Sequence, residues 1–151
     1  MSLRICLVLL IGLAGFGCDT ETASDEAIPQ NAEIATGCQH LNFGPDITLD
    51  LSGETGAAST VHTRYMTELA SDETGNSGAF AWTSSGGHHY FLFDHATTMT
   101  ITQNEMPVEA VATHQAPVNS CDSAISVYEY MLPSGSYVVH LSAEQADLQI
   151  A

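Results

Sequence analysis

Basic residues are almost absent from this chain. Its 151 residues include 18 acidic side chains, no lysine, and only Arg4 and Arg64 as basic residues. A net charge of −16 argues against binding to nucleic-acid backbones or anionic membranes, because like charges repel within a Debye length of roughly 8 to 10 Å. A cationic ligand remains compatible with this charge. The length is too short for two full domains, and a hydrophobic content of 44% is too high for a disordered chain.

Catalytic motifs are also lacking. The sequence contains neither a G-x-S-x-G nucleophile elbow nor an H-E-x-x-H pair. Ser77, Ser84 and Ser85 lie in glycine-rich contexts without a recognisable histidine partner. The Gly86-Gly87 pair precedes a predicted strand rather than a helix, and no lysine follows it, which excludes a phosphate-binding loop. We therefore expect neither an enzyme nor a bound cofactor.

The N-terminus carries features of an export signal. Met1 to Arg4 contain one positive charge, and Ile5 to Phe16 form a run of twelve apolar or small residues. This run is too short to span a bilayer, which needs about 20 residues, but it suits the hydrophobic region of a signal peptide.

The motif Gly-Phe-Gly-Cys at residues 15–18 resembles the lipobox of bacterial lipoproteins. It departs from the usual pattern at Gly15, where an aliphatic residue is common, and at Phe16, where a small one is. The resemblance implies cleavage before Cys18 and lipidation of its sulfur. An ordinary secreted protein with Cys18 near its cleavage point is the alternative. The expected organisation is a signal peptide over residues 1–17, an acidic flexible tether over 18–36, and a folded domain over 37–151.

The four cysteines have different expected roles. Cys6 belongs to the signal segment and Cys18 to the lipid site, so Cys38 and Cys121 remain. In an oxidising compartment these two are expected to form a disulfide. Metal ligation is the weaker alternative, because neither belongs to a C-x-x-C pair.

From Cys38 onward the hydrophobic pattern repeats every two residues, which indicates strands. Residues 46–51 and 60–69 alternate between apolar and polar side chains, and turn residues separate the later segments. No convincing amphipathic helix is evident, and Ser71 to Gly78 reads as a long polar loop. We predict an all-β fold, an antiparallel β-sandwich of about 8 to 9 short strands with one disulfide. The further predicted strands are 79–83, 88–94, 97–103, 108–113, 124–131, 136–141 and 146–150.

Segments of the second half resemble small exported β-sandwich domains of the pre-peptidase C-terminal type. The resemblance is carried by Tyr90 to Phe93, the threonine-rich segment Thr97 to Thr102, and Leu132 to Val139. It implies an accessory or binding module rather than catalysis. The Cys-Gln-His of residues 38–40, Gly44-Pro45 and the His-Thr-Arg-Tyr of residues 62–65 are similar to a group of uncharacterised proteobacterial lipoproteins.

Seven histidines are a high count for this length, and histidine is the commonest metal ligand. His40 and His62 are the best candidates for one site, with His88 or His89 as a third ligand. His88 and His89 point to opposite faces of a strand, so they converge only if the preceding glycines keep them in a loop. The competing interpretation is scattered polar surface histidines. Arg64, the only basic side chain after the signal, is expected to pair with a carboxylate.

Together these observations predict a module of the bacterial cell envelope, lipid-anchored to the inner or outer membrane, with its domain in the periplasm or at the cell surface. Its expected role is non-catalytic binding or structural support, with an unidentified ligand. The alternative is a periplasmic metal-binding protein that holds one zinc or copper ion through interstrand histidines. A third hypothesis is a subunit that binds another envelope protein.

Overall fold

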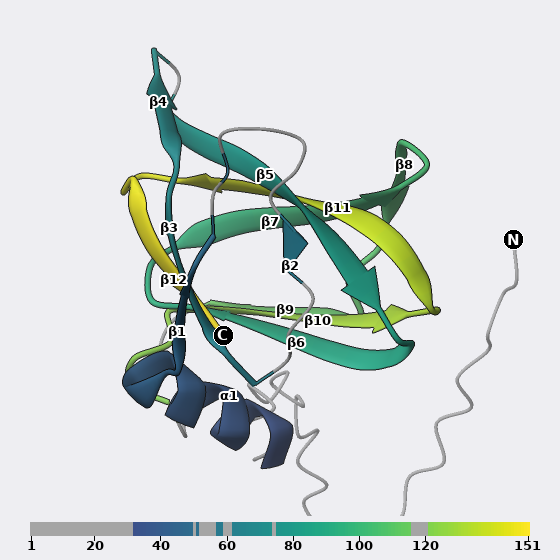
Figure 1. The fold of residues 1–151 in the computed structure, drawn as a ribbon, viewed down its shortest axis with the longest axis horizontal. Helices are drawn as coiled ribbons and strands as arrows, with labels where there is room; N and C mark the ends of the chain where they lie inside the picture. The colour runs from purple at the N-terminus through teal and green to yellow at the C-terminus, as the bar shows by residue number, and fades with distance from the viewer. Residues whose placement is uncertain (1–31, 50, 52–56, 59–61, 74, 116–120) are drawn as a thin grey trace, which may run out of the picture.

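The computed structural model describes residues 32–49, 51, 57–58, 62–73, 75–115 and 121–151. In these residues the chain forms two facing β-sheets with one helix against the outside of the first (Figure 1). The predicted all-β sandwich with a disulfide is confirmed.

The first sheet has the order β1 (Asp46–Thr48), β3 (Arg64–Glu68), β12 (Asp147–Ile150), β6 (Gly87–Phe93), β10 (Ser126–Leu132) and β9 (Ala112–Gln115). The second has the order β2 (Ala57–Ala58), β5 (Gly75–Ser84), β11 (Gly135–Ala143), β7 (Thr97–Gln103) and β8 (Met106–Val108), with β4 (Ala70–Asp72) also paired to β5.

The strand pairs are antiparallel except at two edges, where β1 runs parallel to β3 and β2 runs parallel to β5. The prediction for β7 has the observed bounds, because its apolar and polar residues alternate cleanly between the two faces. The single strand predicted over 108–113 is wrong. Residues 109–111 instead carry the chain from β8 in the second sheet to β9 in the first.

The segment predicted as a long polar loop, Ser71 to Gly78, also folds differently. It is mostly extended, because β4 pairs with the start of β5 in a tight hairpin. The backbone N–H of Gly75 donates to Asp72 Oδ1 over 3.2 Å, and Ser71 Oγ donates to Asn76 Oδ1 over 2.6 Å. Polar side chains that form hydrogen bonds within a hairpin have the same amino-acid composition as an irregular loop, so composition alone does not distinguish the two structures.

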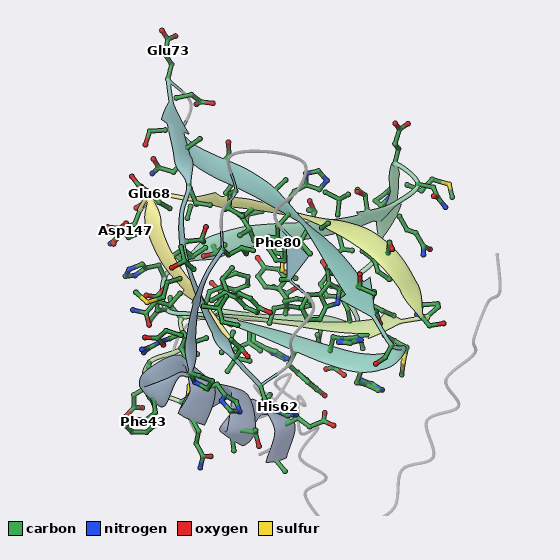
Figure 2. All side chains as sticks on the ribbon, in the orientation of Figure 1. Phe43, His62, Glu68, Glu73, Phe80 and Asp147 are labelled. Carbon is green, nitrogen blue, oxygen red and sulfur yellow. A yellow bond between two sulfur atoms is a disulfide. The ribbon has the colours of Figure 1, made fainter. Side chains whose placement is uncertain are left out.

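The main core lies between the two sheets, where Phe80 is seen among the inward side chains (Figure 2). Aromatic rings dominate it and meet edge to face. The ring centroids of Phe91 and Tyr130 are 6.3 Å apart, and those of Phe93 and Tyr128 are 5.9 Å apart. Such pairs add to the stabilisation that burial alone provides.

Helix α1 (Ala32–Phe43) covers the outer face of the first sheet (Figure 1). Its buried residues Ile34, Cys38 and Leu41 recur at helical spacing and pack against Leu92 of β6 and Val127 of β10. The end of β6, Phe91 to Phe93, is therefore buried on both faces. This explains why Tyr90 to Phe93 form a continuous apolar and aromatic run rather than an alternating one.

The expectation of no amphipathic helix is wrong. The helix begins at Ala32, inside the segment expected to be a flexible tether. Its apolar stripe is narrow, and Thr36 and Gly37 are poor helix formers in its middle, so local propensity is weak. Gly37 allows α1 to pack closely on β6, because a Cβ atom at this position would lie 2.9 Å from Leu92 Cδ1. No helix in the described ranges is long and apolar enough to cross a membrane.

The end of α1 is held by Arg64. Its Nη1 donates to the carbonyl oxygens of Leu41 at 2.9 Å and Asn42 at 3.3 Å, which are free acceptors of the last helical turn. Its Nε and Nη2 bind the two carboxylate oxygens of Asp46 at 2.7 and 2.9 Å. The expectation that Arg64 pairs with a carboxylate is confirmed. This hydrogen-bonded pair raises the pKa of Arg64 and lowers that of Asp46.

The predicted disulfide between Cys38 and Cys121 is confirmed, with the two Cα atoms 5.6 Å apart. It joins the buried face of α1 to the segment that precedes β10. The bond closes a loop across a sequence separation of 83 residues. A loop of this length restricts the unfolded chain strongly.

We expect the double substitution Cys38→Ser and Cys121→Ser to lower the free energy of unfolding by about 4 to 5 kcal/mol, the chain-entropy estimate for a loop of this size. Urea denaturation of the oxidised protein and the double variant measures the difference. Wild-type protein unfolded in the presence of a reductant is the matched control, and it should resemble the variant. A loss below about 1 kcal/mol would show that the disulfide contributes little stability.

Candidate functional site

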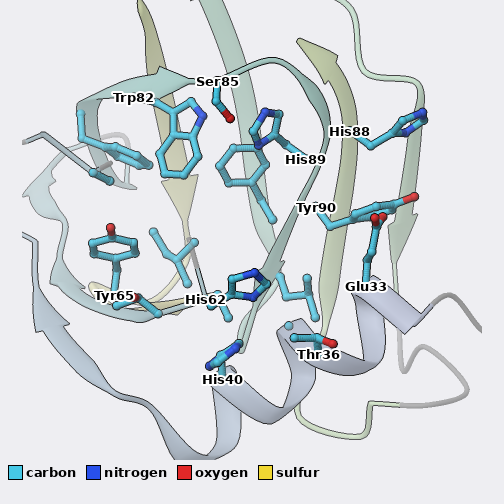
Figure 3. A pocket seen from close by; sticks show the side chains of 18 of the residues that line it. Glu33, Thr36, His40, His62, Tyr65, Trp82, Ser85, His88, His89 and Tyr90 are labelled. Atoms are coloured by element: carbon cyan, nitrogen blue, oxygen red, sulfur yellow. The ribbon is translucent and has the colours of Figure 1, made fainter. Parts of the chain in front are cut away.

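A pocket of about 330 Å³ opens between α1, the first sheet and the edge of the second (Figure 3). This volume lies at the lower end of the range typical of sites for small molecules. Four structural regions contribute to its lining: α1, the start of β3, the turn between β5 and β6, and the C-terminal end of β12. The histidines predicted as metal ligands, His40, His62, His88 and His89, all belong to the lining.

The pocket forms where the first sheet is incompletely paired. Strand β12 pairs with β6 only at Ile150 and Phe93, and the backbone of Ala151 bonds to that of Leu92 in both directions. The earlier half of β6 pairs with β10 on one side. In the described part of the chain no strand flanks its other side. Side chains from this half of β6 therefore line an open space rather than a closed sheet.

The turn between β5 and β6 forms the upper wall of the pocket. Gly86 and Gly87 have φ angles of 98° and 107°, which only glycine adopts without strain. The N–H of Gly86 donates to Ser84 Oγ over 2.9 Å and stabilises the turn. Because the turn takes the chain from the second sheet to the first, it brings Trp82 beside His89.

Trp82 is the most informative residue of the pocket. Its side chain is buried, with 6% exposure, and its ring meets that of Phe91 at 5.5 Å and 70°. Its Nε1–H is buried and has no hydrogen-bond partner among the described residues. A buried donor without an acceptor costs about 1 to 3 kcal/mol. A ligand that offers an oxygen or nitrogen acceptor at this position would recover that cost.

His89 and Ser84 form a hydrogen-bonded pair with 2.8 Å between Nε2 and Oγ. No histidine partner of Ser84 was recognisable in the sequence, because only the tight turn that folds β6 back onto β5 brings the two residues together. Ser84 is only 3% exposed and also accepts the Gly86 N–H, so its hydroxyl serves to position the imidazole. Burial, and secondarily the charge of His88, lower the pKa of His89.

His40 and His62 come together at the lower edge of the pocket (Figure 3). Their ring centroids lie 5.4 Å apart with 52° between the planes. His40 Nδ1 donates to the carbonyl oxygen of Gly44 over 3.2 Å, which leaves its Nε2 available as an acceptor or metal ligand. The structure thus brings together the two residues predicted as the best ligand pair.

His88 and His89 point to opposite faces of β6, as expected. His88 Nδ1 lies 2.9 Å from Glu129 Oε1 of β10, and its ring stacks on that of Tyr90 at 6.4 Å. Figure 3 shows His88 directed away from His40 and His62. Among the described residues, no group of three or more His, Cys, Asp or Glu side chains is arranged to hold a metal ion.

The sequence analysis missed Trp82, Tyr65 and Phe91 as pocket residues. A buried strand and a pocket wall have the same aromatic pattern, so periodicity could not distinguish them. Cys18, the predicted lipid site, lies outside the described residues. No family model matches this chain, and neither does any curated protein.

Because the pKa of His89 is lowered in the folded state from its ordinary value of 6.5, the unfolded chain binds a proton there first as the pH falls. Protonation therefore favours unfolding, and we expect the contribution of His89 to the free energy of unfolding to decline below about pH 6.5. The substitution His89→Gln retains a polar atom near Ser84 but cannot be protonated, so the free energy of unfolding should fall less steeply as the pH is lowered. Urea denaturation between pH 5 and 8 measures it, with His140→Gln on the exposed face of β11 as control. Identical pH profiles for wild type and His89→Gln would contradict this assignment.

Proposed function

We propose that the protein is a lipid-anchored, non-catalytic module of the bacterial cell envelope that binds a small molecule in the pocket between α1 and the two sheets. The observation that carries the binding role is the buried Nε1–H of Trp82, which has no acceptor among the described residues. A folded domain leaves a buried donor unpaired only at a cost. An acceptor atom on a bound ligand accounts for this feature.

The lipid anchor is supported by residues 15–18 and by the pairing of the cysteines. The structure joins Cys38 to Cys121, which leaves Cys18 as the thiol expected in the mature chain. An exported protein with one exposed thiol would be prone to oxidation, whereas a thioether to a glyceride removes that thiol. Attachment to the inner or the outer membrane fits this proposal equally.

The shape and composition of the pocket support binding of a small organic molecule. The walls are mainly apolar and aromatic in area, and they also carry polar side chains, among them Glu33, Thr36, His40 and His62, that can orient a small ligand. Ser84, whose hydroxyl is hydrogen-bonded to His89, is almost fully buried. The same hydroxyl also accepts the N–H of Gly86 in the turn. This burial supports a role in binding rather than in nucleophilic catalysis.

Trp82 is the only tryptophan of the chain, so intrinsic fluorescence reports on this pocket alone. A compound library screened by thermal shift with the full-length protein should yield ligands that raise the unfolding midpoint and change Trp82 emission. Trp82→Phe, which keeps an aromatic ring but lacks the N–H, should weaken their affinity about tenfold in calorimetry.

Tyr128→Phe is the matched control, because it removes the hydroxyl that bonds to the Thr97 carbonyl at 2.7 Å, away from the pocket lining. Ligand affinity should be unchanged in this variant. Ligands that stabilise the protein without changing Trp82 emission, or that bind Trp82→Phe as tightly as wild type, would contradict the proposal.

A second candidate function is metal binding, and the proximity of His40 and His62 favours it. Two imidazoles bound to one tetrahedral ion at about 2.0 to 2.1 Å place their ring centroids roughly 5 Å apart. The observed 5.4 Å is close to this separation. The carbonyl of Gly44 orients His40 in the way that outer ligands commonly orient a metal-bound histidine. Water or a ligand atom would complete the coordination of zinc or copper.

Under this alternative, micromolar Zn(II) or Cu(II) should raise the unfolding midpoint in a saturable manner, and His40→Gln with His62→Gln should abolish the shift. The double variant His114→Gln and His140→Gln is the control with the same number of histidines removed. Sodium chloride tests for a general salt effect on this acidic chain. An equal metal response in both double variants would exclude the His40 and His62 site.

A further inference from the structure

The pocket presents aromatic rings together with negative charge. Tyr65, Trp82, Tyr90 and Phe91 are among its lining residues, and the acidic residue of the lining is Glu33. Among the residues that the structure describes, no lysine or arginine belongs to the lining. Aromatic faces attract cations through the ring quadrupole, most strongly when the site is shielded from water.

Trp82 contacts two other lining rings edge to face. The plane of Trp82 lies at 70° to that of Phe91 and at 85° to that of His89. Figure 3 shows Trp82 and His89 on one side of the space and Tyr65 on another.

The net charge of the whole chain also favours a cationic ligand. The net charge is −16, and Arg64, the basic residue of the folded part, is neutralised by Asp46 through two hydrogen bonds. This field raises the local concentration of cations and opposes anions. A negatively charged ligand would meet repulsion from this field.

The type of cation follows from the hydrogen-bonding groups. A primary ammonium has three N–H donors that all need acceptors after desolvation, and most of the lining surface is apolar. A quaternary ammonium has no N–H donor and is weakly hydrated, so aromatic walls suit it. The Nε1–H of Trp82, which has no partner among the described residues, additionally favours a ligand with an acceptor atom.

We infer that the pocket binds small quaternary ammonium compounds that also carry a hydroxyl or carbonyl oxygen, with the methylated nitrogen against the aromatic rings and the oxygen at Trp82 Nε1. This inference rests on the proposed binding function and specifies its ligand class. Choline is the simplest probe, because it combines a trimethylammonium group with one hydroxyl.

Calorimetry on the full-length protein in maltoside detergent, which carries no ammonium group, compares choline with dimethylbutanol, the isostere in which carbon replaces the nitrogen. The two molecules have nearly the same shape and the same hydroxyl, so their difference isolates the charge. Choline should bind at least about tenfold more tightly than the isostere. It should also change Trp82 emission.

Glu33→Gln should weaken choline binding several-fold and leave binding of the isostere unchanged, because it removes charge from the lining while keeping the side-chain shape. Glu68→Gln is the matched control. It removes the same charge from an exposed position of β3 that lies outside the pocket lining. An equal effect of both substitutions would assign the attraction to the general field and overturn the role of the pocket.

The outcomes separate this inference from the proposed function. Equal affinity for choline and its neutral isostere would overturn the ligand class but leave a binding pocket. The same holds if choline fails to bind while neutral compounds from the library bind and change Trp82 emission. Failure of choline and of every library compound to bind would overturn both proposals.

Discussion

The docking of α1 on β6 is the contact on which the candidate site depends. Leu92 packs against Gly37 from outside the sandwich, while its neighbours Phe91 and Phe93 face the core between the sheets. The disulfide from Cys38 and the Arg64 bonds to the end of the helix hold this arrangement at two places. Without the helix, one wall of the pocket would be missing and Leu92 would be exposed. The helix is therefore both the cover of the first sheet and a part of the site.

The site also combines features that are costly for stability. Trp82 buries a donor without an acceptor, His62 has a φ angle of 60° in the left-handed region, and β6 lacks a strand partner beside the pocket in the described residues. Strained backbone and unpaired polar groups concentrate where ligands bind, because ligand contacts rather than folding determine the residues there. These local costs are offset by the aromatic core and the disulfide.

Much of the fold was predictable from local patterns. The alternation in Thr97 to Gln103 gave the correct strand, and two cysteines in an expected oxidising compartment gave the correct disulfide. The helix was missed although Asn31 precedes it, Gly44-Pro45 follows it and its buried residues recur at helical spacing. Weak propensity concealed these signals, and packing on Leu92 supplies the stability that the isolated segment lacks.

The sequence by itself determined the all-β class and the identity of the disulfide cysteines. These depend on composition and on neighbours within a few residues. Only the tertiary structure decided that His40 and His62 lie together, that His88 turns to Glu129, and that Trp82 lines a pocket with its Nε1–H unpaired among the described residues. His88 and Glu129 are 41 residues apart in the chain, and the relative placement of helix and sheets sets such contacts. Side-chain alternation along a strand gives the face of a residue but not the distance to a residue on another element.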